Sequence, residues 1–202
     1  MQIKKIIAGI YGANCYILMD DKTKEAIVID PGGDANDIVK VINNMGAKVK
    51  YILLTHGHVD HTSGVCEIKA ITNAIVCISK KDDDLITKGE YLFGPLIKGG
   101  ADKFLNDGDI IKVSNIQITC LDTPGHTPGG MSFLTEKCAF TGDTLFAGSI
   151  GRTDFAGGDF NAIINSIKTK LLCIQGDTIV YPGHGPISTI NKEKLNNPFL
   201  QE

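Results

Sequence analysis

Hydrophobic and polar positions divide the chain into two successive sets of strands, each followed by helices. In the first half, apolar runs bounded by glycine, proline or aspartate predict strands at residues 2–7, 14–19, 25–30, 48–55 and 74–79. Apolar residues at helical spacing predict a helix from Asp34 to Gly46, with aspartates to cap its start. A second, short helix is expected at residues 61–70.

The second half repeats this order. Its apolar stretches predict strands at residues 109–113, 116–121, 131–135, 138–141 and 178–181. The clearest helix starts at Asp159 and carries an apolar face that must lie on a sheet, formed by Phe160, Ile163, Ile164, Ile167 and Leu171. A last short helix is expected at 189–195. Residues 82–107 fit no regular pattern, and since such long loops are often functional, we expect a lid there.

Two runs of strands and helices, with a candidate ligand segment after a strand in each, predict an α/β protein. Its two sheets would pack face to face with helices outside. The 202 residues fit a single domain, 1–202, with no linker or clear repeat. The strand ending at Thr55 would deliver a histidine cluster at its carboxyl end, where layered α/β folds bind ligands.

Composition and charge narrow the class of partner. A net charge of −3 and a pI near 5.9, without basic clusters, argue against nucleic acid. The apolar stretches are too short to span a bilayer and the start lacks a signal-like region, so we expect a cytoplasmic protein with no membrane partner. The six cysteines lie at least 11 residues apart, mostly in apolar runs, and are expected as reduced, buried thiols. The oligomeric state stays open.

All five histidines lie in short segments that also carry aspartate or glycine. Three of them, His56, His58 and His61, form a cluster with Asp60 directly after a predicted strand. Three imidazoles and a carboxylate within six residues have little structural use but are good transition-metal ligands. His56 and His58 can point the same way and chelate one ion, whereas Asp60 and His61 would reach a second position beside it.

Three residues outside this cluster complete the candidate site. His126 and His184 each lie next to glycine, where the backbone turns tightly, and would arrive from other strands. Either histidine alone would be better explained as an ordinary hydrogen-bonded residue, and it is the cluster that makes them candidate ligands. Asp143 follows Gly142 at a strand end, and its two oxygens could bridge ions about 3.5–4 Å apart. Asp60 and Asp143 are also the candidate catalytic carboxylates.

These motifs, in this order, resemble the metallo-β-lactamase superfamily, at residues 55–61, 125–129, 142–146 and 182–185. The segment G-S-I-G-R-T-D at 148–154 is similar to glyoxalase II-type hydrolases, in particular to their short single-domain form. The resemblance implies an αββα four-layer sandwich of two mixed sheets, with the site at one edge between them. It also implies one metal on His56, His58 and His126, a second on Asp60, His61 and His184, and Asp143 with a hydroxide between the two.

Four details refine what the resemblance implies. The cofactor would be two divalent metal ions, zinc first, with iron or manganese as alternatives because nitrogen and oxygen ligands do not exclude them. Asp143 stands where some β-lactamases of the superfamily have cysteine, which argues against a lactamase. The sequence ends at Glu202, so we expect no carboxyl-terminal helical domain of the kind that holds glutathione in two-domain glyoxalase II enzymes. Arg152, the only arginine, would bind the thiol part of the substrate or, equally, brace its loop through Asp154.

The favoured activity is hydrolysis of a small-molecule thioester. Zinc lowers the pKa of bound water from about 15.7 towards ~7, which supplies hydroxide in neutral solution. A thiol with a pKa near ~8.5 leaves as thiolate without a strong general acid, and every histidine is already assigned to metal. Two alternatives stay open. Persulfide dioxygenases, with one non-haem iron, share the histidine motif and the G-R-T-D-F segment at 151–155, and a non-catalytic metal-binding module is the other.

Overall fold

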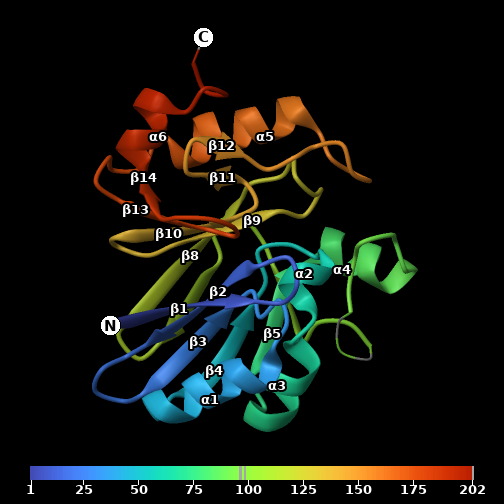
Figure 1. Ribbon diagram of the computed structural model, residues 1–202, viewed down its shortest axis with the longest axis vertical. Coiled ribbons are helices and arrows are strands. Elements are labelled where there is room, and N and C mark those ends of the chain that lie inside the picture. The colour runs from blue at the N-terminus through green and yellow to red at the C-terminus, as the bar shows by residue number, and fades with distance from the viewer. Residues whose placement is uncertain (96, 98, 202) are drawn as a thin grey trace.

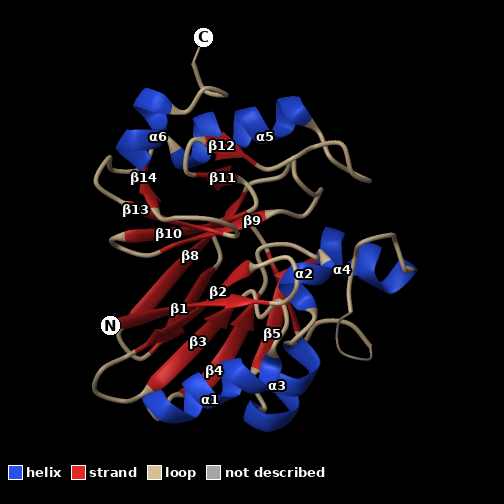
Figure 2. Cartoon of the chain, viewed as in Figure 1, coloured by secondary structure: helices blue, strands red, loops and turns tan. Residues whose placement is uncertain are grey.

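The computed structural model describes residues 1–95, 97 and 99–201, which form four layers (Figure 1). Two six-stranded sheets pack against each other, and helices cover the outer face of each sheet (Figure 2). This arrangement confirms the αββα sandwich. Each sheet buries one face against its helices and the other against the second sheet, which explains why the central strands are apolar on both sides.

The first sheet is mixed. Its strands lie in sequence order, β1 (Gln2–Ala8), β2 (Ala13–Met19), β3 (Glu25–Ile29), β4 (Lys48–Leu53), β5 (Ile75–Ser79) and β6 (Lys103–Leu105). The first three strands pair antiparallel, and β3 to β6 pair parallel. Helices α1 (Ala35–Met45) and α3 (Val65–Thr72) cover its outer face, and α2 (Val59–Thr62) and α4 (Lys80–Lys88) follow β4 and β5.

The second sheet has the order β14–β13–β10–β9–β8–β7, and only β10 and β13 pair parallel. Its strands are β7 (Ile110–Val113), β8 (Ile116–Asp122), β9 (Met131–Leu134), β10 (Cys138–Gly142), β13 (Ile179–Pro182) and β14 (Ser188–Thr189). A small hairpin of β11 (Leu145–Phe146) and β12 (Ser149–Ile150) lies beside it. Helix α5 (Phe160–Ser166), continued by a π-helical turn (Ile167–Leu171), and α6 (Ile190–Asn196) cover the outer face.

Strand β2 shows how one segment serves two cores. Cys15, Ile17 and Met19 belong to the cluster of side chains beneath α1 and α3, whereas Tyr16 and Leu18 belong to the cluster between the sheets. Successive side chains of a strand point to opposite faces, so both faces of β2 must be apolar. All seven of its residues are buried.

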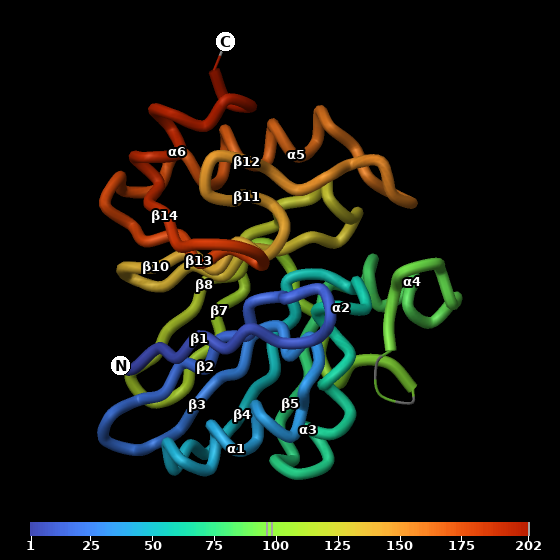
Figure 3. The backbone as a smooth tube through the Cα atoms, in the orientation of Figure 1, coloured from blue at the N-terminus to red at the C-terminus, as the bar shows by residue number. Residues whose placement is uncertain are grey.

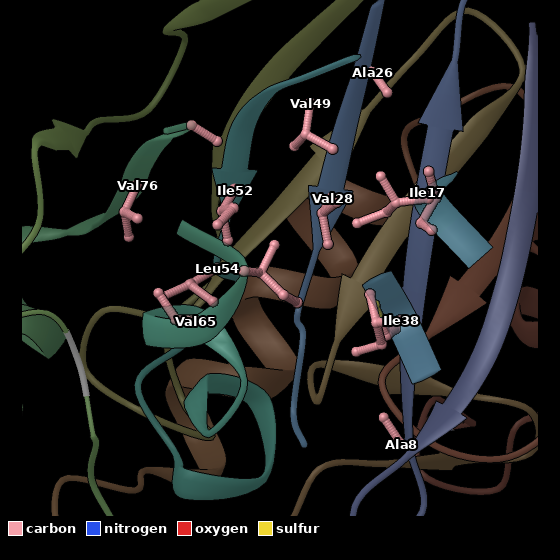
Figure 4. Close-up of a cluster of buried hydrophobic side chains, with 14 of the residues drawn as sticks. Ala8, Ile17, Ala26, Val28, Ile38, Val49, Ile52, Leu54, Val65 and Val76 are labelled. Atoms are coloured by element: carbon pink, nitrogen blue, oxygen red, sulfur yellow. The ribbon is translucent and has the colours of Figure 1, made fainter. Parts of the chain in front are cut away.

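The core under the first sheet joins segments that are distant in sequence. Figure 4 shows Ile38 of α1 and Val65 of α3 in one cluster with Ile17, Val28 and Ile52 of the strands. Every one of these side chains has essentially no exposed surface. Burial of this apolar area, at roughly 25 cal/mol per Å², holds the helices on the sheet.

Residues 82–107 are more regular than expected. They contain most of α4 and the strand β6, so the prediction of one long loop is wrong there. Three consecutive aspartates give α4 a polar start, which hid its helical pattern. Residues 96 and 98 lie outside the described residues. Leu92 of this segment does lie at the site described below, and its carbonyl oxygen accepts a hydrogen bond from the Val59 amide at 2.8 Å, so its lid role stays a prediction.

Three smaller expectations need correction. The helix expected at 61–70 is two short helices, α2 and α3, with a break at residues 63–64. Asp34 does precede α1, but in a left-handed conformation, and its carboxylate accepts from the Gly9 amide at 2.8 Å instead of capping the helix. Phe160, at the start of α5, is 51% exposed, whereas Ile163, Ile164 and the turn that follows pack into the core.

All six cysteine thiols are free, as expected for reduced cysteines. Four of them are buried, namely Cys15, Cys77, Cys120 and Cys138, whereas Cys66 and Cys173 are exposed. None of the helices in the described part of the chain has the length and apolar character that a membrane span requires.

The substitution Phe133→Ala tests the core between the sheets. Phe133 on β9 has no exposed surface, so its truncation should lower the free energy of unfolding by about 3–5 kcal/mol. Urea denaturation followed by circular dichroism measures this loss. Phe160→Ala removes the same atoms from a half-exposed position and should cost far less, and equal losses in the two variants would contradict the assigned core.

Candidate metal centre

A cavity of about 480 Å³ opens where loops from both sheets meet. Its lining includes five of the seven predicted metal ligands, namely His58, Asp60, His126, Asp143 and His184. His56 and His61 lie behind them, buried to 2% and 0% exposure. The other lining side chains are mainly apolar, so the polar groups converge at one wall of a largely hydrophobic cavity.

The carboxyl ends of strands and the short helix α2 supply these side chains. His56 and His58 follow β4, Asp60 and His61 lie on α2, His126 follows β8, Asp143 follows β10, and His184 follows β13. The parallel strands β10 and β13 lie side by side (Figure 3), which brings Asp143 and His184 to the same edge. The predicted position of the site at strand ends is therefore what the fold provides.

Three groups of three side chains place their ligand atoms close together, and one of them, His56, His61 and Asp143, joins the two that are described next. In the first group, the atoms offered by His56, His58 and His126 lie within 4.8 Å of one another, and His58 Nδ1 is 2.9 Å from His126 Nε2. In the second group, Asp60 Oδ2 lies 3.2 Å from His184 Nε2 and 3.7 Å from His61 Nε2. This division is the one that the resemblance implied.

Asp143 lies between the two groups. Its Oδ2 is 3.6 Å from Nε2 of both His126 and His184, and its Oδ1 is 3.4 Å from His61 Nε2. A single carboxylate thus faces one ring of the first group and two rings of the second. Oδ1 is buried and has no hydrogen-bond partner among the described residues.

The glycines beside these residues allow the close approach. A Cβ atom on Gly183 would overlap Oδ1 of Asp143, and one on Gly142 would overlap the Thr55 side chain. Gly142 also has a left-handed φ of 48°, which favours glycine. Glycine is therefore required at position 142 by space and by conformation, and at position 183 by space.

Hydrogen bonds behind the rings fix which nitrogen faces the site. Nδ1 of His126 lies 2.7 Å from the carbonyl oxygen of Arg152, and because a carbonyl can only accept, this nitrogen carries the proton. Nδ1 of His61 likewise donates to the carboxylate of Asp30 at 3.0 Å. In both rings Nε2 therefore faces the cluster, and in the neutral ring it presents a lone pair there, as metal-binding histidines do.

Asp30 is a buried carboxylate behind the site that the sequence analysis did not select. Besides His61, it accepts hydrogen bonds from the amide and the hydroxyl of Thr55, at 2.7 and 2.6 Å. Because the Thr55 hydroxyl donates to Asp30, its oxygen is left to accept from Nδ1 of His56, 3.1 Å away. One carboxylate thus orients a ring in each group. The position of Asp30 at the end of a predicted strand, directly before Pro31, is the sequence feature that could have pointed to this role.

Asp82 is the second residue that was missed. It has no exposed surface and accepts from the amides of Gly57 and Gly129, at 2.8 and 2.7 Å, and from the Thr127 hydroxyl at 2.8 Å. It therefore ties the loop that carries His58 to the loop that carries the histidine at 126. Burial raises the pKa of Asp82, while these hydrogen bonds oppose the rise. No sequence signal pointed to it, because its helix was not recognised.

Burial and neighbouring charges separate the protonation states in the cluster. Burial, with repulsion from nearby imidazoles, lowers the pKa of His56 well below its usual value and lowers that of His58 to about 3. Burial would also lower the pKa of His61, but Asp143 and Asp30 outweigh it and raise the pKa to about 9. His56 and His58 are thus neutral near pH 7, the form in which imidazole binds metal.

Arg152 lies at the rim of the cavity and makes contacts of both kinds that the sequence suggested. Its guanidinium forms two hydrogen bonds to Asp154, at 2.7 and 2.6 Å, and lies 3.8 Å from the ring centre of Phe155. Both members of this ion pair are exposed, at 56% and 65%. The bracing contact with Asp154 is therefore present. Because an exposed ion pair is weak, it would not prevent Arg152 from binding substrate, and that role stays a prediction.

Comparison with known proteins identifies the class of this fold and site. Residues 8–184 match the metallo-beta-lactamase superfamily. The chain is 39% identical to the hydroxyacylglutathione hydrolase GloC of Haemophilus influenzae, over 99% of this chain and 98% of that protein. The crystal structure of the BLEG-1 B3 metallo-beta-lactamase superposes with a TM-score of 0.92 at 34% identity over 100% of both chains. TTHA1623 in a di-iron-bound form has a TM-score of 0.80 at 29% identity, over 98% of this chain and 100% of that chain.

The chain therefore belongs to the metallo-β-lactamase superfamily, and it is a metal-dependent hydrolase of that superfamily. The histidine and aspartate cluster is suited to divalent metal ions. The expected glyoxalase II-like character agrees with the GloC relative.

The substitution Asp30→Asn tests the support behind the rings. An amide cannot accept from three donors as the carboxylate does, so His61 and His56 should lose their fixed orientation. We expect metal affinity to fall about 10- to 100-fold, as measured by competition with a chromogenic chelator. Asp37→Asn on the exposed face of α1 makes the same change of charge and should leave the affinity unaltered. An unchanged affinity in Asp30→Asn would contradict the orienting role.

Proposed function

We propose that this protein hydrolyses small-molecule thioesters with two divalent metal ions, most simply zinc, and that Asp143 lies between them. The observation that carries the proposal is the position of the Asp143 carboxylate, 3.4–3.6 Å from rings of both ligand groups. One metal would be held by His56, His58 and His126, and the other by Asp60, His61 and His184. Asp60 and Asp143 would be the catalytic carboxylates.

The donor set fits such ions. Nε2 of His56 and Oδ1 of Asp143 are buried without a hydrogen-bond partner among the described residues, and burying such atoms unpaired is costly. A cation between the groups would satisfy these atoms and offset the repulsion of converging lone pairs and carboxylates. Metal ions bound here would supply a water nucleophile of lowered pKa and stabilise negative charge on the substrate carbonyl oxygen.

The residues around the cluster favour a thioester over an amide. In hydrolysis a C–O bond forms from water as the C–S bond breaks, and the thiol departs as thiolate because its pKa is near ~8.5. An amine would need a proton from a general acid. All five histidines belong to the two ligand groups, and Arg152 at the rim is always charged, so neither supplies that proton.

The relative GloC, named a hydroxyacylglutathione hydrolase, supports a thioester substrate, since the alignment at 39% identity covers 98% of that protein. The thiol carrier would lie against the wall of the cavity that Arg152 and Phe155 form. A single domain over residues 1–202 and a cytoplasmic location are further parts of the proposal, and the six free thiols support the latter.

β-Lactam hydrolysis is the second candidate, favoured by the superposition with the BLEG-1 B3 metallo-beta-lactamase. The aspartate at position 143 and the assignment of all five histidines to the two ligand groups weigh against it. The di-iron form of TTHA1623 favours two metals as well, with iron as the alternative to zinc. The persulfide dioxygenase hypothesis instead requires one iron and consumption of oxygen.

The test is to purify the protein without added metal, determine metals per chain by elemental analysis, and assay that sample. We expect two metals per chain at saturation and hydrolysis of thioesters in preference to β-lactams. One iron per chain with oxygen uptake on a persulfide would instead establish the dioxygenase. A metal-loaded sample without any of these activities would favour a non-catalytic module.

The substitutions His58→Ala and Asp143→Ala probe one group and the bridging position. Each should reduce kcat/KM by more than about 10³-fold, because each removes a ligand of the ions that activate the nucleophile. The far-ultraviolet circular dichroism spectrum should keep its native shape. Retention of two tightly bound metals and of activity in Asp143→Ala would contradict the bridging role.

The pair of Arg152 and Asp154 provides a test of substrate binding. Arg152→Ala should raise KM for thioesters of carboxylate-bearing thiols and leave a neutral aryl thioester nearly unaffected. Asp154→Asn should lower KM for the same anionic substrates a few-fold, since it frees the guanidinium from a weak exposed pair. Asp37→Asn, which breaks the exposed pair with Lys40, is the control for net charge. If Arg152→Ala lowers kcat equally for every substrate, the residue braces its loop instead.

A further inference from the structure

A second, smaller cavity of about 240 Å³ adjoins the metal centre. It shares Tyr11, Val59 and Asp60 with the larger cavity, so the two meet at the ligand cluster. The rest of its lining comes from the turn after β1, the turn after β3 and the end of α2, namely Gly9, Ile10, Gly32, Gly33 and Ser63. Figures 1 and 3 show the turn between β1 and β2 lying beside α2.

Glycine backbone makes one wall of this cavity. A Cβ on Gly33 would come within 2.8 Å of the Cα of Gly9, so the two turns pack at backbone distance. The carboxylate of Asp34 accepts from the amide of Gly9 at 2.8 Å and fastens the turn after β1 to the turn after β3. The wall is therefore held in place before any ligand binds, which reduces the entropic cost of binding.

The chemistry of the cavity suits an uncharged, apolar group. Asp60 is the only charged side chain in the lining, and its carboxylate is directed to the cluster, 3.2 Å from His184 Nε2. At the mouth, Ile10 is 92% and Tyr11 is 61% exposed, and large apolar side chains gathered at a site commonly mark a binding surface. A short alkyl chain would cover both.

We infer that this cavity binds the acyl chain of the thioester, while the thiol part occupies the larger cavity. The assignment rests on the proposed function, because it is the reacting carbonyl group that must lie at the cluster where the two cavities meet. The size and charge of the two cavities decide which part of the substrate each one binds. The larger space carries the guanidinium of Arg152 at its rim, which suits a polar carrier. The smaller space is mainly apolar, and Asp60 is the one charged side chain in its lining.

The first experiment measures chain-length preference with one neutral thiol. Acetyl, butyryl and hexanoyl thioesters of N-acetylcysteamine differ only in the acyl chain. We expect kcat/KM to rise about threefold to fourfold for each methylene that enters the cavity and to level off when it is full. Hydrolysis of all three substrates with equal kcat/KM would overturn the acyl site and leave the thioesterase proposal standing.

Two variants locate the preference. Ser63→Leu would fill the smaller cavity from a wall that the larger one does not share, so the ratio of hexanoyl to acetyl kcat/KM should fall towards one. Ile10→Ala should lower the same ratio a few-fold, because it removes an apolar side chain from the mouth of the smaller cavity. Ile7→Ala is the matched control, since Ile7 is 67% exposed on β1 and lines neither cavity. An equal fall in Ile7→Ala and Ile10→Ala would overturn the assignment.

A binding measurement separates this site from catalysis. Calorimetric titration of the metal-loaded protein with acetate, butyrate and hexanoate measures the affinity for the acid product without turnover. We expect Kd to fall along the series in the native protein and in Ile7→Ala but not in Ser63→Leu. If no thioester is hydrolysed and this pattern still holds, the cavity is an alkyl-chain site and the hydrolase proposal is the part that fails. A Kd independent of chain length in the native protein would overturn the site itself.

Discussion

The arrangement of the molecule around its site depends on the convergence of lone pairs and carboxylates at the ends of strands from both sheets. Within each of the two ligand groups, the ligand atoms lie no more than 4.8 Å apart, and two of the imidazole nitrogens are 2.9 Å apart. The groups are His56, His58 and His126 on one side and Asp60, His61 and His184 on the other. Such a cluster repels itself unless cations occupy it, and it is stable only where the surrounding fold holds each group in place. The two sheets, their glycine turns and the buried carboxylates behind the rings meet this requirement.

Two of those carboxylates, Asp30 and Asp82, connect segments that are far apart in sequence. Asp30 orients a ring of each ligand group, His61 directly and His56 through Thr55. Asp82 joins the loop between β4 and α2 to the loop between β8 and β9. Buried carboxylates that accept several hydrogen bonds act as fixed anchors, because each donor would otherwise be left without a partner. The positions of the candidate ligands thus depend on these buried carboxylates as well as on the strands and helix that carry the ligands.

In the proposed function, specificity depends largely on different elements from those that hold the cluster. The strand ends and α2 carry the candidate ligands, whereas the turns after β1 and β3 and the loop of Arg152 supply other parts of the cavity walls, beside Val59 of α2. Loops can change without disturbing the strands beneath them. This separation explains how one αββα scaffold accommodates relatives named for different reactions, a hydroxyacylglutathione hydrolase and a B3 metallo-beta-lactamase among them.

The sequence by itself determined the two-sheet fold, most of the strands and the seven candidate ligands, because apolar periodicity and the spacing of histidine and aspartate are local properties of the chain. It did not reveal α4, the anchoring roles of Asp30 and Asp82, or the pairing of Arg152 with Phe155. An aspartate on a polar helix start or before a proline has the same local pattern whether it is solvated or buried. Only the tertiary structure decided the roles of Asp30 and Asp82, since they arise from hydrogen bonds between segments separated by 25 to 47 residues.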